Sequence, residues 1–186
     1  MDVVWIDKKM PAETIALKTK LKNIIGLLDG SNQSIRRILS ELRPVVLDDY
    51  GLIEAMEWLG RQFTTNTGIP VKFVSSEAEI KAPELIATCI FRVYQEAFTN
   101  ITKHARAKAI STSLDIIDDT IVVIIEDDGK GFKIESAQSN KSFGIFGMKE
   151  RVLSLDGKFE LFSSPGRGTK IVITLPYAIN KKANLT

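Results

Sequence analysis

Four side chains near the middle of the chain have the types and spacing that metal–phosphate chemistry requires. Glu96, Asn100, Lys103 and His104 fall at i, i+4, i+7 and i+8 of an apolar-periodic run that begins near Pro83, which predicts one amphipathic helix with all four on a shared face. An amide oxygen can ligate a divalent cation, a carboxylate can order a water or take a proton, and cations can neutralise phosphate oxygens. Alone, this stripe is weak evidence, because charged helix faces usually just face water.

Three glycine-containing segments that follow the helix strengthen the interpretation. Asp127–Gly131 comes directly after an apolar strand pattern, Ser142–Met148 opens a further helix, and Gly166–Thr169 precedes a β-branched strand. Glycines let the backbone approach a ligand closely, and the free amides at the start of a helix can hold an anion. Each segment alone is more commonly a tight turn. Their occurrence together, in this order, favours a nucleotide site.

Composition excludes several classes of protein. The 186 residues are 44% hydrophobic and 26% charged, as expected of one globular domain with an appendage. A net charge of +2 gives no reason to expect a nucleic acid or an acidic membrane as partner. Cys89 is the only cysteine, which excludes a disulfide framework, and we expect it to be buried and reduced on the apolar side of the helix. No signal peptide or membrane-spanning run is visible, so we expect a cytoplasmic protein.

The elements that position these residues can be predicted from periodicity. A heptad pattern predicts one helix from about Glu13 to Arg43, ended by Pro44, although two helices broken at Gly30 are a competing interpretation. The seam residues are Leu17, Leu21, Ile24, Leu28, Ser31, Ile35, Ile38 and Leu42, and such a seam needs a partner helix. A connector and a helix over 52–67 follow. The remaining expected elements are strand 71–75, the long helix from Pro83, strands 109–117 and 121–127, a helix over 145–155, and strands 158–163 and 169–176. This order predicts an α+β two-layer sandwich.

The chain resembles the kinase core of bacterial two-component sensor histidine kinases, in the class associated with NarL/LuxR-type response regulators. Their catalytic domains belong to the GHKL ATPase superfamily, which has the Bergerat ATP-binding fold. The resemblance covers Trp5 to Pro176 and rests on the segments 34–43, 47–52, 95–105, 127–132, 147–152 and 165–169. It implies a partial dimerisation and histidine-phosphotransfer segment over 1–45, a connector helix over 46–67, a catalytic ATP-binding domain over 68–177 and a frayed tail over 178–186.

The resemblance also implies a role for each motif residue, with ATP and Mg²⁺ as cofactors. On the adenine side, Asp127 would bind the adenine amino group, Gly129 and Gly131 would make room for the base, and Thr169 would close the site. On the phosphate side, Asn100 would hold Mg²⁺ and Glu96 would be the polarising carboxylate or general base. The residues implied to lie near the phosphates, or in a short lid over them, are Lys103, His104, Gly144, Ile145, Gly147 and Met148.

Two departures from the family pattern are visible. The family's acceptor histidine lies in a stretch of the form Glu-Leu-His-Asp, which this chain lacks, and its single histidine, His104, belongs to the nucleotide motif. We therefore expect the acceptor upstream of Met1, in a longer sensor kinase that is a homodimer and passes the phosphoryl group to a response regulator. The second departure is Ser142, where the family usually has a glycine. A non-kinase regulatory GHKL module is the alternative function, and a gyrase-like hydrolase is a weaker third.

Overall fold

The computed structural model describes residues 20, 24, 44–134 and 143–177. The chain divides into two compact units, Met1–Arg43 and Pro44–Thr186. The predicted heptad helix, and with it the choice between one helix and two, lies outside the described residues except for Lys20 and Ile24, which are both helical and exposed.

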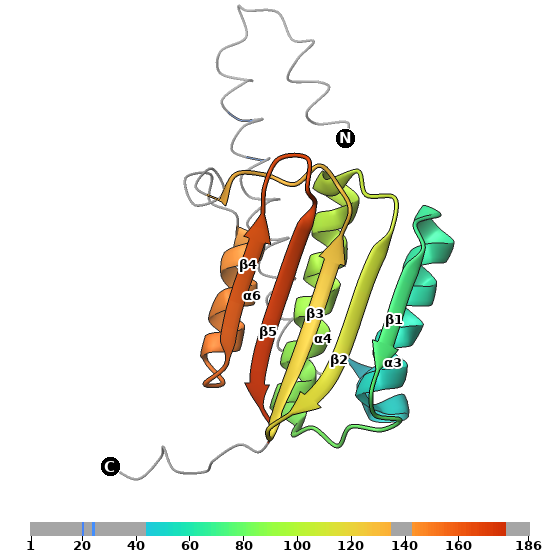
Figure 1. Cartoon of the computed structure of the whole chain (residues 1–186). Coiled ribbons are helices and arrows are strands. Elements are labelled where there is room, and N and C mark those ends of the chain that lie inside the picture. The colour runs from blue at the N-terminus through green and yellow to red at the C-terminus, as the bar shows by residue number, and fades with distance from the viewer. Residues whose placement is uncertain (1–19, 21–23, 25–43, 135–142, 178–186) are drawn as a thin grey trace, which may run out of the picture. The chain divides into compact units, whose positions relative to one another are not determined.

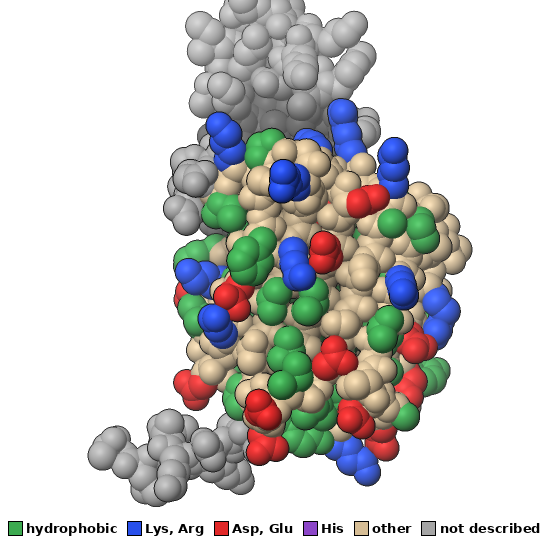
Figure 2. Space-filling view, viewed as in Figure 1, with side chains coloured by type: hydrophobic (Ala, Val, Ile, Leu, Met, Phe, Trp, Pro, Cys, Tyr) green, Lys and Arg blue, Asp and Glu red, His purple; other side chains and the backbone are tan. Residues whose placement is uncertain are grey.

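The second unit is a five-stranded sheet with its helices on one face. The strand order is β1-β2-β3-β5-β4, with β1 parallel to β2 and every other pair antiparallel. Figure 1 shows the helices α3, α4 and α6 behind the sheet. Figure 2 shows the opposite face, where hydrophobic and charged side chains are interspersed. This arrangement is the predicted α+β two-layer sandwich. No described helix is long and apolar enough to span a membrane.

The strands agree closely with the expected ones. Their bounds are β1 Val71–Ser75, β2 Ile110–Ile117, β3 Thr120–Asp127, β4 Lys158–Ser163 and β5 Thr169–Pro176. The β2–β3 hairpin turns at Asp118 and Asp119, which have positive φ angles of 46° and 58°. Positive φ at both central residues is the geometry that a two-residue hairpin requires, and aspartate tolerates it.

The helix α3 (Val45–Thr67) begins earlier than predicted. The sequence predicts a connector before Leu52, whereas the structure has helical backbone from Val45 and an interruption at Gly51, with φ 80° and ψ −179°. Glycine permits this backbone, so the chain bends there and the helix resumes. The helix ends at Gly68, as predicted, where a left-handed residue donates its amide to the carbonyl of Thr64 at 2.8 Å.

The long helix has two different parts, which corrects the sequence interpretation. Residues Glu84–Asn100 form the α-helix α4, but Ile101–Ala105 form a π-helical turn, η1. A π turn closes i→i+5 hydrogen bonds, so it shifts the side chains that follow relative to the α-helical stripe. Glu96 and Asn100 keep the predicted spacing. Lys103 and His104 lie on the π turn and are exposed, so the expectation of a single four-residue α-helical face was wrong.

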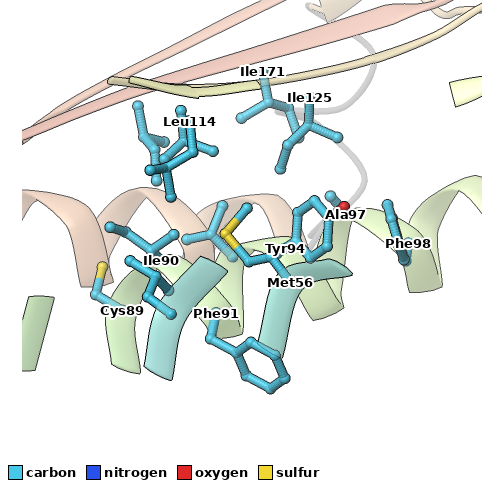
Figure 3. Packing of buried hydrophobic residues seen from close by; sticks show 14 of the residues in the cluster. Met56, Cys89, Ile90, Phe91, Tyr94, Ala97, Phe98, Leu114, Ile125 and Ile171 are labelled. Carbon is cyan, nitrogen blue, oxygen red and sulfur yellow. The ribbon is translucent and has the colours of Figure 1, made fainter. Parts of the chain in front are cut away.

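The core lies between α4 and the inner face of the sheet, with α3 and α6 (Phe143–Leu153) beside α4. Figure 3 shows Met56, Ile90 and Tyr94 packed beneath Leu114, Ile125 and Ile171. Cys89 is buried here as a free thiol, as predicted. The strict alternation of burial along β3 places Ile121, Val123 and Ile125 in the core. The same alternation turns the last residue of the strand, Asp127, toward the helices.

Candidate functional site

Three segments meet at the end of the sheet where β3 terminates. The amide of Lys130, just after β3, donates to the carbonyl of Ala105 at the end of η1, at 2.8 Å. The Lys130 carbonyl in turn accepts the amide of Gly166, from the β4–β5 loop, at 2.6 Å. The helix end and both loops are therefore tied together through backbone groups, as the order of the sequence motifs predicts.

Asp127 is the buried charge of this region, with a relative exposure of 6%. Its Oδ1 accepts the amide of Gly129 at 2.8 Å, which holds the loop in a tight turn. Burial raises the pKa of Asp127, and the neighbouring carboxylates of Asp128 and Glu126 act in the same direction, while the amides of Gly129 and Thr169 oppose the shift. Burying a carboxylate disfavours its charged form, and a carboxylate kept in such a position is typical of a functional site.

Two glycines around Asp127 are required by close backbone approaches. A methyl group at Gly129 would lie 2.5 Å from the carbonyl oxygen of Ala105 and 2.6 Å from Oδ1 of Asp127. Gly168 has a φ of +67°, and a methyl group there would collide with the carbonyl oxygen of Asp127. The aspartate therefore lies between two backbone segments that leave no space for a side chain.

The β4–β5 loop completes the adenine side proposed from the sequence. Gly131 has a φ of +57°, and a methyl group there would strike the carbonyl of Ser164. The hydroxyl of Ser163 accepts the amide of Phe132 at 3.0 Å, donates to the carbonyl of Gly168 at 2.9 Å, and lies 3.1 Å from the Thr169 hydroxyl. Thr169 is also the cross-strand partner of Asp127. Ser163 joins the two loops here, and sequence reasoning missed it because a serine at a strand end carries no motif of its own.

Asp128 is a second residue that the sequence left without a role. Its Oδ1 accepts the amides of Lys108 and Ala109 at 2.7 Å and 3.0 Å, and these hydrogen bonds lower the pKa of Asp128. The adjacent aspartates therefore have different tasks, because strand alternation turns Asp127 inward and leaves Asp128 at the surface. Asp128 fixes the segment that enters β2.

Glu96, Asn100 and Gly144 form the other half of the site. A methyl group at Gly144, at the start of α6, would collide with Oε1 of Glu96 and lie 3.5 Å from Nδ2 of Asn100. The Nδ2 atom of Asn100 is buried and has no hydrogen-bond partner among the described residues. A buried amide without a partner is costly, and it suits a position that a ligand completes.

These residues fit a magnesium–nucleotide complex. Magnesium keeps several waters and is usually held by one or two side chains together with substrate phosphates. In the described part of the chain, no three His, Cys, Asp or Glu side chains are grouped as a protein-only metal site would need. The Asn100 amide, facing the helix start at Gly144, is the oxygen donor that such a complex requires.

The other residues predicted for the phosphate side lie on the π turn and on α6. Lys103 and His104 are exposed on the π turn. Gly144 and Ile145 lie in the first turn of α6, where amides have no partner within the helix, whereas Gly147 and Met148 lie in the second turn. Met148 is buried in the core at 3% exposure. The helix start can thus receive an anion through its first-turn amides.

Positive charge surrounds this end of the sheet. Figure 2 shows several Lys and Arg side chains at the end where β3 terminates. The exposed basic residues of the three converging segments are Lys103, Arg106, Lys108, Lys130 and Arg167. A triphosphate carries several negative charges, so this rim favours its approach.

Comparison with known proteins agrees with this geometry. Residues 87–179 match the model of the family described as histidine kinase-, DNA gyrase B-, and HSP90-like ATPases. The chain is 35% identical over 161 residues to the signal transduction histidine-protein kinase/phosphatase DegS of Brevibacillus brevis, covering 87% of this chain and 41% of the relative. It is 32% identical over 155 residues to the oxygen sensor histidine kinase NreB of Staphylococcus carnosus, covering 83% of this chain and 45% of that protein. The chain thus spans less than half the length of these relatives.

A solved structure shares the fold. The histidine kinase domain of the blue-light activated histidine kinase of Erythrobacter litoralis aligns with a TM-score of 0.53 at 19% identity, covering 66% of this chain and 59% of that one. The segments that converge on Asp127 and Asn100 all lie within the residues that match the family model. The resemblance inferred from the sequence is confirmed at the level of the family and the fold.

Proposed function

We infer that this chain, which belongs to the family of histidine kinase-, DNA gyrase B-, and HSP90-like ATPases, is the ATP-binding catalytic core of a sensor histidine kinase. The observation that carries this inference is the convergence of two half-sites on the ends of α4 and α6. One half holds a buried carboxylate between glycines at Asp127. The other holds, at Asn100 near Glu96, a buried amide nitrogen that no described residue hydrogen-bonds.

The geometry supports a division of roles on the adenine side. The Asp127 carboxylate accepts the adenine amino group from its buried position, where the amide of Gly129 fixes its Oδ1. Gly129 and Gly131 leave space for the base, and Thr169 closes this side from β5. Specificity for adenine then follows from one acceptor in a desolvated position.

The phosphate side provides charge neutralisation and proton handling. Asn100 holds Mg²⁺, which when bound neutralises charge on the phosphates. The first-turn amides of α6 at Gly144 and Ile145, with Gly147 and Met148 behind them, receive phosphate oxygens, and Lys103 and His104 add positive charge. Glu96 orients and polarises the attacking group. Phosphoryl transfer needs chiefly such positioning and electrostatic stabilisation.

The acceptor and the partners lie beyond this chain. The chain covers 41% and 45% of these two relatives, and a histidine upstream of Met1 receives the γ-phosphoryl group. Residues 1–45 belong to the dimerisation and phosphotransfer hairpin, 46–67 to the connector and 68–177 to the catalytic domain. The full-length protein acts as a homodimer and passes the phosphoryl group to a NarL/LuxR-type response regulator. Its use of ATP supports a cytoplasmic location for this region.

A substitution that removes the negative charge of Glu96 but keeps its shape tests the proposal. In the full-length protein, Glu96→Gln should lower phosphohistidine formation by about 100-fold or more, the scale of general acid–base catalysis, while ATP affinity stays within about threefold. Glu150→Gln on α6, an exposed carboxylate, is the matched control and should retain activity.

Unchanged phosphorylation in the Glu96 variant would refute the assigned role. If the intact protein binds ATP but never forms phosphohistidine, the non-kinase regulatory module becomes the better account.

A further inference from the structure

The strand β1 is one edge of the sheet, and half of its backbone groups face away from the other strands. Within the five-stranded sheet it pairs with β2 alone, in parallel. The carbonyl of Pro70, just before β1, accepts the amide of Ile110 on β2 at 3.0 Å. Because successive residues of a strand direct their backbone groups to opposite sides, Lys72 also faces β2, whereas Val71 and Phe73 face the free edge.

The free edge has one occupied backbone group and others that are open. The amide of Val71 donates to the hydroxyl of Thr64 on α3 at 3.2 Å, so this amide points away from β2. In the described part of the chain, no hydrogen bond reaches the amide or the carbonyl of Phe73 from this side. Phe73 therefore offers a donor and an acceptor to another extended chain.

A cavity of about 520 Å³ lies beside this edge, between β1 and α3. Figure 1 shows α3 behind β1, which is the outermost strand on that side of the sheet. A methyl group at Gly60 would lie 3.3 Å from Cγ1 of Val71, so the glycine lets the helix and the strand come close at the base of the cavity. The volume is in the range of natural ligand pockets. The residues that line it are Glu57, Gly60, Arg61, Thr64, Thr65, Val71 and Phe73.

The cavity favours an apolar side chain. Val71 and Phe73 supply apolar surface from the inner face of β1. The two charged residues of the lining, Glu57 and Arg61, form an ion pair with each other at 3.0 Å. A charged side chain that entered the cavity would therefore find no free partner of opposite charge, whereas an apolar one would gain contacts.

The outer side of β1 has a different chemistry. Lys72 and Val74 are exposed and point to the face opposite to that of Phe73. The neighbour of Lys72 on β2 is the neutral Ser111, and Lys72 has no ion pair with any described residue. A strand added at the edge would place one of its side chains directly beside Lys72. A carboxylate in that position is attracted, and an ammonium group is repelled.

We propose that the free edge of β1 and the cavity beside it bind an extended peptide segment of a partner protein in which apolar and acidic residues alternate. The segment adds a strand to the sheet through the backbone of Phe73, and its apolar side chains enter the cavity while its acidic side chains lie beside Lys72. The two chemistries must alternate because successive side chains of a strand point to opposite faces. The strand β2 separates β1 from β3, so this surface is distinct from the site around Asp127.

Fluorescence anisotropy with labelled synthetic peptides tests this surface on the whole chain. The first probe is a peptide of about eight residues in which valine and glutamate alternate. The second has lysine in place of glutamate, the third has alanine in place of valine, and the fourth carries methyl groups on its backbone nitrogens. The wild-type chain should bind the first peptide about fivefold or more tightly than each of the others, the scale expected of lost cross-strand pairs and backbone hydrogen bonds.

A charge reversal identifies the contribution of Lys72. Lys72→Glu should invert the preference, so that the lysine peptide binds about fivefold more tightly than the glutamate peptide, while the urea midpoint of unfolding stays unchanged. Lys158→Glu makes the same change on β4, the opposite edge strand, and should retain the wild-type preference.

Hydrogen exchange measured by NMR locates the bound peptide. The amide of Phe73 should exchange more slowly when the valine–glutamate peptide is bound, whereas the amide of Lys72, which already faces β2, should change little. Equal binding of the glutamate and lysine peptides, undiminished binding of the N-methylated peptide, or unchanged exchange at Phe73 would overturn the proposal. Self-association of the chain that Lys72→Glu abolishes would also overturn it, because a second copy would then occupy the edge.

Discussion

Substitution of Asp127 by asparagine should weaken nucleotide binding and stabilise the fold at the same time. The carboxylate is 6% exposed, and one oxygen is used by the Gly129 amide. Asparagine has nearly the same shape and can retain that bond through its oxygen. Its amino group would then face the adenine amino group, so two donors would meet where a donor and a charged acceptor met before.

The loss of affinity can be estimated from the hydrogen bond that disappears. A hydrogen bond to a charged group contributes about 2 kcal/mol, which corresponds to an increase in dissociation constant of about 30-fold. Calorimetric titration with Mg-ADP measures this directly. Asp119→Asn, in the β2–β3 hairpin, makes the same chemical change at the surface and should leave the affinity unaltered.

The effect on stability has the opposite sign and depends on pH. Burial raises the pKa of Asp127 in the folded state above its value in the unfolded chain, so the folded state binds the proton more tightly. The stability associated with this group is therefore greatest below the unfolded pKa and is lost as pH rises through the folded pKa. Without nucleotide, Asp127→Asn should be more stable than the wild type in urea at neutral pH, and the difference should vanish at low pH. Unchanged affinity, or lower stability at neutral pH, would refute the reasoning.

Two further substitutions separate the site from the core. Gly129→Ala should destabilise the fold by about 1–3 kcal/mol and abolish measurable ADP binding, because its methyl would meet the Ala105 carbonyl. Gly68→Ala, at the end of α3, has a strained φ of +73° but its methyl meets nothing within 4 Å, so this control should keep ADP binding; equal loss of binding in the two variants would contradict this account. Tyr94→Phe removes the hydroxyl that lies 3.2 Å from the Thr112 hydroxyl and should cost about 1 kcal/mol in urea unfolding without altering ADP affinity; a variant as stable as the wild type would show that this buried contact contributes nothing.

The fold could be predicted in detail because its signals are local. Alternation along 120–127 and 169–176 predicts strands with one buried face, and the apolar period from Pro83 predicts the helix that covers them. The turn at Gly68 follows from the glycine. These patterns act within a few residues, so a single sequence is enough to read them.

The parts that could not be predicted depend on contacts between distant segments. Nothing local shows that the helix changes to π geometry at Ile101, because the Ala105 carbonyl is held by a loop 25 positions later, at Lys130. The same holds for Ser163, whose hydroxyl joins Phe132 and Gly168. Glu96, Asn100 and Asp127 could be singled out because their types and spacing suit nucleotide chemistry, and their roles stay predictions. The roles of Lys103 and His104 stay predictions.

The most direct test of a magnesium–nucleotide site is calorimetric titration of this chain and its Asn100→Ala variant with Mg-ADP and with a non-hydrolysable ATP analogue, each with and without Mg²⁺. The account predicts magnesium-dependent binding by the wild-type chain that the variant loses, because Asn100 places a buried side-chain amide near Gly144 and Glu96. Binding of equal strength in the variant, or binding that ignores Mg²⁺, would contradict the assignment of Asn100 and with it the arrangement of the phosphate side.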